Sequence, residues 1–319
     1  HGILAEYPPG SPFKLIGALV GLQEGVITPR TAMTCNHGFH FGSLTVACHC
    51  KGGRLALNEA ISESCNNYFC TVYQRTIDKD GDAHAGMNRW STHVKSFGLG
   101  TFLGNDLPTG RKGLIPDASY YDRFLGYSTW KGATSVSNGI GQGELVATPI
   151  QLANMTAAIA NRGYYYTPHI IRESDHGPID SNFTVPNYTT VDSQHFEVVI
   201  NGMFDVFERG TAKGARIPHI TQCGKTGTAQ NPHGQDHSIF VSFAPKDQPK
   251  IALAVIIENG YWGSRWAAPI ASLMTEKYLT DTITRPALEA RMFEGDLHEE
   301  YRQQHVAIYG EDSTYQANF

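Results

Sequence analysis

The stretch Tyr7-Pro8-Pro9-Gly10-Ser11-Pro12-Phe13-Lys14 joins a predicted helix start to two reactive side chains. Ser11 followed by Pro12 is typical of a helix N-cap with proline at the first helical position. Lys14 follows one turn later on the same helix face, where its amine can approach the serine hydroxyl. A serine hydroxyl is a weak nucleophile unless a neighbouring base takes its proton. The spacing therefore predicts Ser11 as a nucleophile and Lys14 as its base.

Two further strings, Ser64-Cys65-Asn66 and Lys225-Thr226-Gly227-Thr228, follow in the chain and extend this chemistry. The first string alone is equally typical of an N-cap, a turn or a polar helix surface. The second is more distinctive, because a glycine in a strand lets a ligand backbone approach closely, although a bulge on an edge strand is an alternative. Together the three strings supply a nucleophile, a base and oxyanion donors, which acyl transfer through a serine requires.

A second Ser-x-x-Lys string, Ser128-Thr129-Trp130-Lys131, competes for the role of nucleophile. At average residue usage such a string occurs by chance about once in a few hundred residues. Ser128 lies in a loop-like aromatic stretch, whereas Ser11 stands at a predicted helix start. We therefore assign the nucleophile to Ser11.

Composition agrees with a folded domain and excludes several classes of function. The chain has 319 residues, of which 41% are hydrophobic and 17% charged, enough to bury a sizeable core. Its net charge is −5, and no block of lysine or arginine suggests a nucleic-acid or anionic-lipid partner. No apolar run approaches the roughly 18 residues of a membrane helix, and the N-terminus lacks a signal-peptide pattern. Since the sequence begins ten residues before Ser11 and without Met, we expect it to be a fragment.

Periodicity and turn signals predict mixed α and β structure. Helices are expected over residues 13–26, 55–77, 87–97, 148–160, 196–208 and 267–278. Strands in an antiparallel meander are expected over 219–228, 238–244 and 251–258. Segment 27–54 is expected to form loops and a short hairpin, and 78–143 to be mostly irregular. The charged tail from residue 285 is expected to form peripheral helices or to be partly ordered.

The chain has six cysteines, at positions 35, 48, 50, 65, 70 and 223. They are too few for a disulfide scaffold in a chain of this length, yet most of them lie close together in the sequence. Segment 35–50 offers six soft or borderline metal ligands: Cys35, His37, His40, Cys48, His49 and Cys50. By residue type this set suits tetrahedral zinc, although the spacing is not that of a standard zinc finger. A disulfide from Cys35 to Cys48 or Cys50 and a set of free thiols are the alternatives, because sequence does not fix Cβ separations. No metal and no cofactor is assigned from the sequence.

The three strings and several longer stretches resemble the transpeptidase domain of class B penicillin-binding proteins. Ser-x-x-Lys, Ser-x-Asn and Lys-Thr-Gly are the signature that penicillin-binding proteins share with class A β-lactamases. The stretches that look like the class B proteins are residues 7–14, 64–69, 139–153, 223–230 and 240–245. The likeness runs from about residue 5 to about residue 280, and within the class the chain is most similar to the elongation type, penicillin-binding protein 2.

The resemblance implies an α/β (α+β) fold of the serine β-lactamase/transpeptidase type. This fold is an antiparallel sheet with flanking helices plus a mostly helical subdomain. The family's strands that precede the nucleophile are missing from this fragment, so we expect one central strand to be left as an exposed edge and the isolated fragment to be poorly stable. We expect a transpeptidase domain over residues 1–284 and a C-terminal tail over 285–319.

The resemblance also implies an activity and four catalytic roles. The family performs D,D-transpeptidation, the cross-linking of peptidoglycan stem peptides that end in D-Ala-D-Ala, and β-lactams acylate the same serine. By this likeness Ser11 attacks the penultimate D-Ala carbonyl and an unprotonated Lys14 accepts its proton. Ser64 relays a proton to the departing D-Ala, and Asn66 holds Lys14 and the substrate amide.

The Lys-Thr-Gly string carries the binding roles in the same family. The backbone N–H groups of Ser11 and Thr228 are expected to form the oxyanion hole. Lys225 is expected to act as a catalytic cation and, with the hydroxyls of Thr226 and Thr228, to bind the terminal carboxylate. Gly227 is expected to keep the strand face open.

The implied partners are peptidoglycan stem peptides, β-lactams and a membrane glycosyltransferase of the elongation machinery. The implied location is the bacterial cell envelope, at the periplasmic face of the inner membrane, with the anchor outside this fragment. The alternatives are a penicillin-sensing receptor domain, a D,D-carboxypeptidase and a β-lactamase. A β-lactamase needs a carboxylate that activates the deacylating water, and the chain has no Glu-x-x-Leu-Asn string.

Several other residues receive a structural interpretation. Cys65 stands where β-lactamases commonly carry Asp, and its side chain is expected to point away from the reacting carbonyl. Gln142 and Thr148-Pro149 are interpreted as turn and cap residues that maintain the fold, with substrate contact as the alternative. Trp262 and Trp266 are interpreted as aromatic packing, with a wall of the peptide cleft as the alternative.

Overall fold

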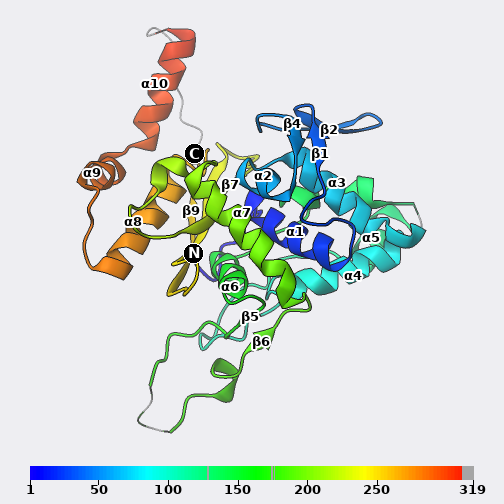
Figure 1. Ribbon diagram of the computed structural model, residues 1–319, viewed down its shortest axis with the longest axis horizontal. Helices are drawn as coiled ribbons and strands as arrows, with labels where there is room; N and C mark the ends of the chain where they lie inside the picture. Colours follow the sequence, from blue (N-terminus) through cyan, green and yellow to red (C-terminus); the bar gives the residue numbers. More distant parts are fainter. Residues whose placement is uncertain (128, 174, 176, 311–319) are drawn as a thin grey trace.

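The computed structural model describes residues 1–127, 129–173, 175 and 177–310, so that Ser128 of the second Ser-x-x-Lys string lies outside it (Figure 1). Its main sheet has three antiparallel strands in the order β7-β8-β9. The strands are β7 (Cys223–Ala229), β8 (His237–Ala244) and β9 (Ile251–Ile257). This confirms the predicted meander, except that β7 begins at Cys223 rather than at His219.

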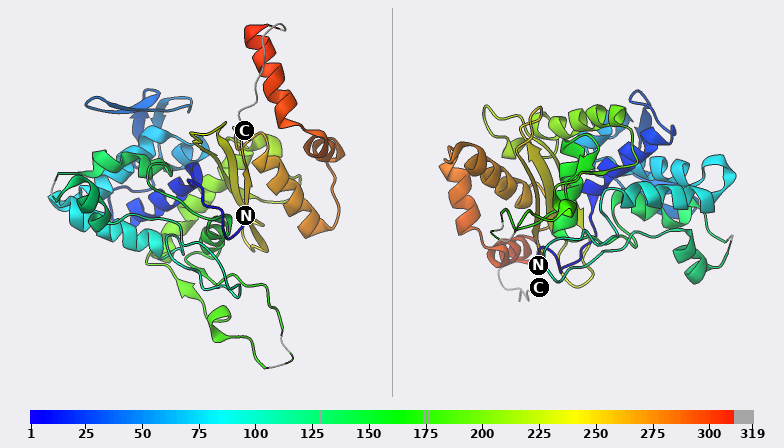
Figure 2. Two further views of the ribbon diagram at one scale, coloured as in Figure 1. Left: turned by 180° about the vertical axis from the view of Figure 1, so that it is seen from behind. Right: turned by 90° about the horizontal axis from the view of Figure 1, so that it is seen from below.

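Helices cover both faces of this sheet (Figure 2). α8 (Ala267–Thr280) packs on one face, and α6 (Pro149–Ala160) and α7 (Phe196–Glu208) pack on the other. The Thr148 hydroxyl and the Gln151 side chain form a capping box at the start of α6, which confirms the cap interpretation of Thr148-Pro149. Burial of β8 on both faces explains why its sequence is almost continuously apolar or small.

The second part of the molecule is mostly helical and contains the buried helix that begins at Lys14. Its elements are the 3-10 turn Ser11–Phe13, α1 (Lys14–Gln23), α2 (Leu57–Ser62), α3 (Asn66–Ile77), α4 (Ala83–Lys95), α5 (Ala118–Leu125) and the 3-10 segment Gly132–Ile140. The single helix predicted over 55–77 is wrong, because the chain turns at Ser64, whose φ is 58°. Segment 78–143 also holds more helix than predicted, since Asp82 and Asp117 act as N-caps of α4 and α5 rather than as loop residues.

Three short strand pairs extend from this framework. β1 (Met33–Cys35) pairs with β4 (Gly53–Leu55), and β2 (Gly38–Phe41) forms the expected hairpin with β3 (Leu44–Ala47). β5 (Tyr164–Tyr165) pairs with β6 (Asn187–Tyr188) at the base of a long excursion (Figure 1). The β2–β3 hairpin and its flanking segments contribute one wall of the cleft described below.

The outer edge of the sheet and the chain's last helices are the remaining parts of the described fold. All seven residues of β9 are half-buried, and within the described residues its outer edge has no strand partner, so the low stability expected for the fragment stays a prediction. α9 (Pro286–Glu294) and α10 (Leu297–Tyr309) follow as peripheral helices, as expected (Figure 1). Arg285, directly before α9, forms an ion pair with Glu276 of α8 at 2.9 Å.

Among the described helices, none has the length and apolar character needed to cross a membrane. The boundary between residues 284 and 285 stays a prediction.

Candidate active site

An open cleft of about 650 Å³ lies between β7 and the turn that joins α2 to α3. Six of the eight predicted site residues line it: Ser11, Ser64, Asn66, Thr226, Gly227 and Thr228. The other two, Lys14 and Lys225, are fully buried. The structure therefore gathers residues from three distant parts of the sequence into one site.

The turn that carries Ser11 is fixed by close packing against β7. The amide of Gly10 donates to the carbonyl of Gly141 at 2.8 Å, and the φ of Gly10 is 59°, a value that favours glycine. A Cβ on Gly227 would lie only 2.5 Å from Cδ of Pro12. Gly227 is thus needed because the Pro12 ring packs on it, a reason that differs from the open strand face expected from the sequence.

The Lys14 amine is surrounded by three acceptors. Its Nζ donates to the carbonyl of Ser64 at 2.7 Å, to the hydroxyl of Ser64 at 3.1 Å and to Oδ1 of Asn66 at 2.5 Å. An ammonium has three N–H donors, so the charged form satisfies all three contacts. A neutral amine has two donors and one lone pair, and that lone pair can accept a proton from a hydroxyl in the cleft.

Burial allows a substantial fraction of the Lys14 amine to be neutral near physiological pH. Loss of hydration lowers the pKa of Lys14 to about 8, although the nearby cysteine thiols act in the opposite direction. Burial also lowers the pKa of Lys225 well below its ordinary value, and the charge of Lys14 lowers it further. Since the repulsion between two ammonium groups is mutual, a charged Lys225 favours neutral Lys14.

The Ser64–Asn66 turn is held in an uncommon backbone conformation. A positive φ at Ser64 is unfavourable for a residue with a Cβ, and it persists only where the surroundings impose it. Asn66 provides much of this restraint, because its Nδ2 donates to the carbonyl of Ala47 at 2.7 Å and its backbone N–H donates to Sγ of Cys48 at 3.1 Å. The turn therefore presents the Ser64 hydroxyl and the Asn66 amide oxygen to Lys14.

The opposite wall is formed on β7 by Thr226, Gly227 and Thr228, and the side chain of Lys225 is buried. The Thr226 hydroxyl lies 2.6 Å from the hydroxyl of Thr211, a cleft residue that could not be predicted from the sequence because no motif surrounds it. Lys225 donates from Nζ to the carbonyl of Thr226 at 3.1 Å. Trp262 lines the cleft as well, and its ring packs edge-on against His49. Trp266 is buried, in agreement with its interpretation as packing.

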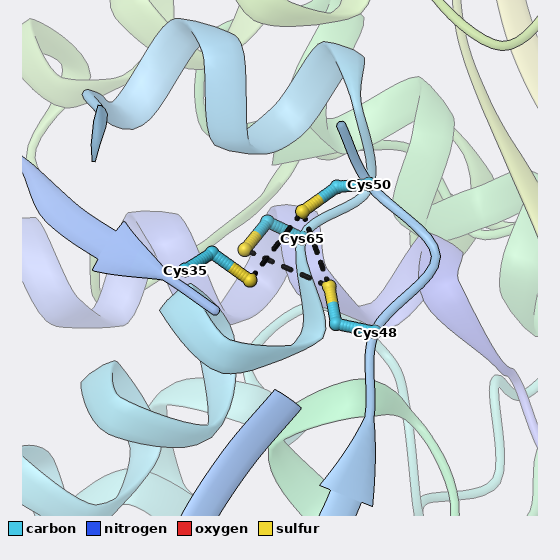
Figure 3. A group of neighbouring side chains, drawn as sticks. All are labelled: Cys35, Cys48, Cys50 and Cys65. Carbon is cyan, nitrogen blue, oxygen red and sulfur yellow. Dashed lines mark hydrogen bonds between the residues drawn. The ribbon is translucent and has the colours of Figure 1, made fainter. Parts of the chain in front are cut away.

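Four buried cysteines form a compact cluster beside the Ser64–Asn66 turn (Figure 3). Its members are Cys35, Cys48, Cys50 and Cys65, whose sulfur atoms all lie within 4.8 Å of one another. The separations are 3.3 Å for Cys48–Cys50, 3.5 Å for Cys35–Cys50 and 3.8 Å for Cys48–Cys65. These distances are too long for a disulfide, whose sulfurs are about 2 Å apart, and all four cysteines are free in the structure.

The cluster has the number, type and spacing of ligands that a tetrahedral zinc ion takes. A zinc–sulfur distance of about 2.3 Å places the sulfurs of a tetrahedral site about 3.8 Å apart. The hydrogen bond from Cys65 is the main factor that lowers the pKa of Cys48 to about 3, so one member already favours the thiolate that binds metals. Cys35, Cys48, Cys50 and Cys65 could therefore hold one soft or borderline metal ion.

This ligand set differs from the one suggested by the sequence. His37, His40 and His49 are outside the cluster, and the fourth member is Cys65 from the Ser64-Cys65-Asn66 string. The Ser64-Cys65-Asn66 motif predicts a Cys65 side chain that points away from the reacting carbonyl, and it does not predict a metal ligand there. Cys65 lies directly before α3, and its Sγ is the N-cap acceptor of that helix. The motif gives no distance between Cys65 and Cys48, so the sequence does not identify Cys65 as the fourth ligand.

Comparison with known proteins agrees with this architecture. A family model described as the penicillin binding protein transpeptidase domain matches residues 3–276. Peptidoglycan D,D-transpeptidase MrdA of Acinetobacter baumannii is 35% identical over 309 residues, which cover 88% of this chain and 43% of that protein. The chain thus spans less than half the length of this curated relative.

Two solved structures are similar in fold as well as in sequence. Pseudomonas aeruginosa PBP2 in complex with WCK 5153 is 33% identical with a TM-score of 0.77, covering 88% of this chain and 60% of that one. A chain from a peptidoglycan synthase complex, described as coordinating polymerization and crosslinking, is 28% identical with a TM-score of 0.75, covering 89% of this chain and 48% of that one. The serine β-lactamase/transpeptidase fold predicted from the sequence is confirmed. This chain belongs to the family of penicillin-binding-protein transpeptidase domains.

Proposed function

We propose that this chain is the catalytic domain of a serine D,D-transpeptidase that cross-links peptidoglycan stem peptides. The observation that carries the proposal is the Lys14 amine, buried within hydrogen-bond distance of Ser64 and Asn66 and one helical turn from Ser11. Family membership supports the same chemistry. β-Lactams are proposed to acylate the same serine.

In the proposed acylation, Ser11 forms a bond from Oγ to the carbonyl carbon of the penultimate D-Ala. Lys14 in its neutral form takes the Ser11 proton as this bond forms. The Ser64 hydroxyl, 3.1 Å from the Lys14 amine, passes its proton to the nitrogen of the terminal D-Ala as the C–N bond breaks, and it takes the former Ser11 proton from the Lys14 ammonium. The products of this half-reaction are an ester on Ser11 and free D-Ala.

The second half-reaction transfers the acyl group to an amine. The amino group of a second stem peptide attacks the ester carbon, its proton passes to the Lys14–Ser64 pair, and the Ser11 oxygen leaves as a hydroxyl. A new peptide bond joins the two stems. Water in place of the amine would give a carboxypeptidase, so the acceptor distinguishes the two activities.

Stabilisation of the oxyanion is assigned to backbone N–H groups. We place the oxyanion between the N–H groups of Ser11 and Thr228, on the two walls of the cleft. The hydroxyls of Thr226 and Thr228 are proposed to bind the terminal carboxylate. Lys225 is fully buried and donates to the Thr226 carbonyl, which favours an action through the position of Thr226 over direct contact with substrate.

The cellular setting is proposed from the relatives. Similarity to a chain of a complex that coordinates polymerization and crosslinking supports a membrane glycosyltransferase as partner. The peptidoglycan activity named for the relative supports a location in the bacterial envelope, at the periplasmic face of the inner membrane. A penicillin-sensing receptor domain would use the same acylation without an acceptor, and a β-lactamase would need a water-activating carboxylate.

Labelling with a fluorescent penicillin tests the nucleophile. Purified protein is expected to take up the label, to lose it with Ser11→Ala and to keep it with Ser128→Ala. Loss with Ser128→Ala would move the nucleophile, and failure of the unmodified protein to label would contradict acyl transfer. A donor stem peptide mixed with an amine acceptor then separates the functions: cross-linked product indicates a transpeptidase, hydrolysed donor a carboxypeptidase, and a stable adduct without turnover a sensor.

A further inference from the structure

Gln142 occupies a backbone acceptor on the cleft side of β7. Its Nε2 donates to the carbonyl oxygen of Thr228 at 3.1 Å, and both residues line the cleft. Because a carbonyl oxygen can only accept, the amide nitrogen of Gln142 must be the atom that faces it. The interpretation of Gln142 as a turn residue leaves this side-chain contact unexplained.

The contact shows which way the backbone of Thr228 faces. In an antiparallel ladder, two opposed residues exchange both of their N–H···O bonds or neither. The Thr228 carbonyl bonds Gln142 outside the sheet, so Thr228 and its partner Ser238 form the pair that exchanges none. The N–H of Thr228 therefore faces the cleft together with its carbonyl.

An extended peptide bound along this edge would use both backbone groups of Thr228. One residue of the peptide would accept from the Thr228 N–H and donate its own N–H to the Thr228 carbonyl. In the reaction proposed above, the residue whose carbonyl meets the Thr228 N–H is the penultimate D-Ala. Its N–H is thus the natural donor to the acceptor that Gln142 now fills.

Resting on that proposed function, we propose that Gln142 is a specificity-determining residue whose side-chain amide takes the place of the substrate N–H in the free enzyme. Donor binding exchanges one amide donor for another, and the displaced Gln142 side chain turns into the cleft. A ligand that brings an N–H to this position replaces the lost hydrogen bond. A ligand without such an N–H leaves the Gln142 side chain in place. Its rate of acylation is therefore unchanged when the Gln142 amide is removed.

The backbone around Gln142 is fixed, so that the side chain alone has to move. Gly141 has a φ of 75°, and a Cβ on it would lie 2.0 Å from the carbonyl oxygen of Gly10. The Gln142 N–H donates to the carbonyl of Ser137 at 3.0 Å. The Gln142 side chain itself is half-buried at the cleft surface, where rotation requires no repacking of the core.

Two β-lactams that differ at this position test the inference. Benzylpenicillin carries an acylamino N–H on the carbon next to its reactive carbonyl, as D-Ala does, whereas a carbapenem carries a hydroxyethyl group there. The variant Gln142→Met keeps the length of the side chain and removes the donor. The second-order acylation rate constant for benzylpenicillin is expected to rise about five-fold, the value of one ordinary hydrogen bond, while that for the carbapenem stays unchanged.

The control is Gln194→Met, which makes the same change at an exposed position outside the residues that line the cleft, and it is expected to alter neither rate constant. Gln142→Glu, isosteric and unable to donate when ionised, is expected to change the ratio of the two rate constants in the same direction. An unchanged ratio in both variants, or an equal fall for both ligands, would overturn the inference and leave acyl transfer by Ser11 intact. Absence of acylation in the unmodified protein would instead contradict the proposed function, and the inference with it.

Discussion

The amine nitrogen of Lys14 lies 2.5 Å from the side-chain oxygen of Asn66. Asn66 is itself held from the other side by the Ala47 carbonyl, so this contact fixes the amine rather than the amide. The buried amine has a pKa of about 8, lowered by loss of hydration. The geometry and the protonation state of one side chain therefore determine the reactivity of the site.

The first prediction concerns pH. Neutral Lys14 is the reactive form, and the amine becomes neutral as the pH rises through about 8. The second-order rate constant for acylation by benzylpenicillin is expected to increase from pH 6, to reach half of its limiting value near pH 8 and to level off about one pH unit above that. Lys14→Arg, which stays charged, is expected to be slow at every pH. A rate constant that is independent of pH over this range would contradict the assignment of Lys14 as base.

The second prediction isolates the contact between Asn66 and Lys14. Asn66→Ala removes the acceptor of a charge-assisted hydrogen bond, and it is expected to slow acylation about 10- to 100-fold. Asn67→Ala is the matched control, because the Asn67 side chain donates to the Thr34 carbonyl and is not a ligand of Lys14. Acylation kinetics and thermal unfolding are measured for both variants. Equal rates for the two variants would remove Asn66 from the catalytic network.

Much of the fold and the candidate site could be predicted from the sequence, because their signals are local. Continuous apolar runs indicated the strands around Phe240 and Val255, and Thr148 with its proline indicated the start of α6. The motif residues from Ser11 to Thr228 lie around one cleft. This could be predicted because the spacing of the reactive side chains resembles that of a known family.

The features that could not be predicted depend on contacts between distant segments. Ser64 has no intrinsic preference for a φ of 58°, and the restraint comes from Asn66 and its neighbours. Cys65 joins the sulfur cluster through distances that a sequence does not contain. The contact of Gly227 with Pro12 likewise depends on how β7 packs against the Ser11 turn.

The third prediction tests that packing. A methyl group at position 227 would approach the Pro12 ring to 2.5 Å, so Gly227→Ala must separate β7 from the turn that carries Ser11. We expect a loss of about 1–3 kcal/mol in the free energy of unfolding and a clear fall in the acylation rate constant. Gly214→Ala is the control, since a Cβ there meets nothing within 4 Å. Unchanged kinetics in Gly227→Ala would show that the two walls tolerate separation.

The last prediction concerns the state of the four cysteines. Three of their sulfur separations lie between 3.3 and 3.8 Å and all lie within 4.8 Å, which fits a tetrahedral metal site and not a disulfide. Purified protein is therefore expected to contain one zinc ion per chain by elemental analysis. Four thiols are expected to react with a thiol reagent only after a chelator has removed the metal. A disulfide would instead give two missing thiols that a reductant restores, and free thiols would react on unfolding with no zinc released.

Two variants connect this metal site to the reaction. Cys35→Ser removes a ligand that lies outside the Ser64–Asn66 turn, whereas Cys223→Ser changes a buried cysteine outside the cluster. Cys48 accepts the backbone N–H of Asn66, so loss of the metal is expected to loosen the turn that holds Lys14. Cys35→Ser should then lose both zinc and most of the acylation rate, while Cys223→Ser keeps both. Full acylation by a zinc-free Cys35→Ser protein would separate the cluster from catalysis and restrict it to a role in folding.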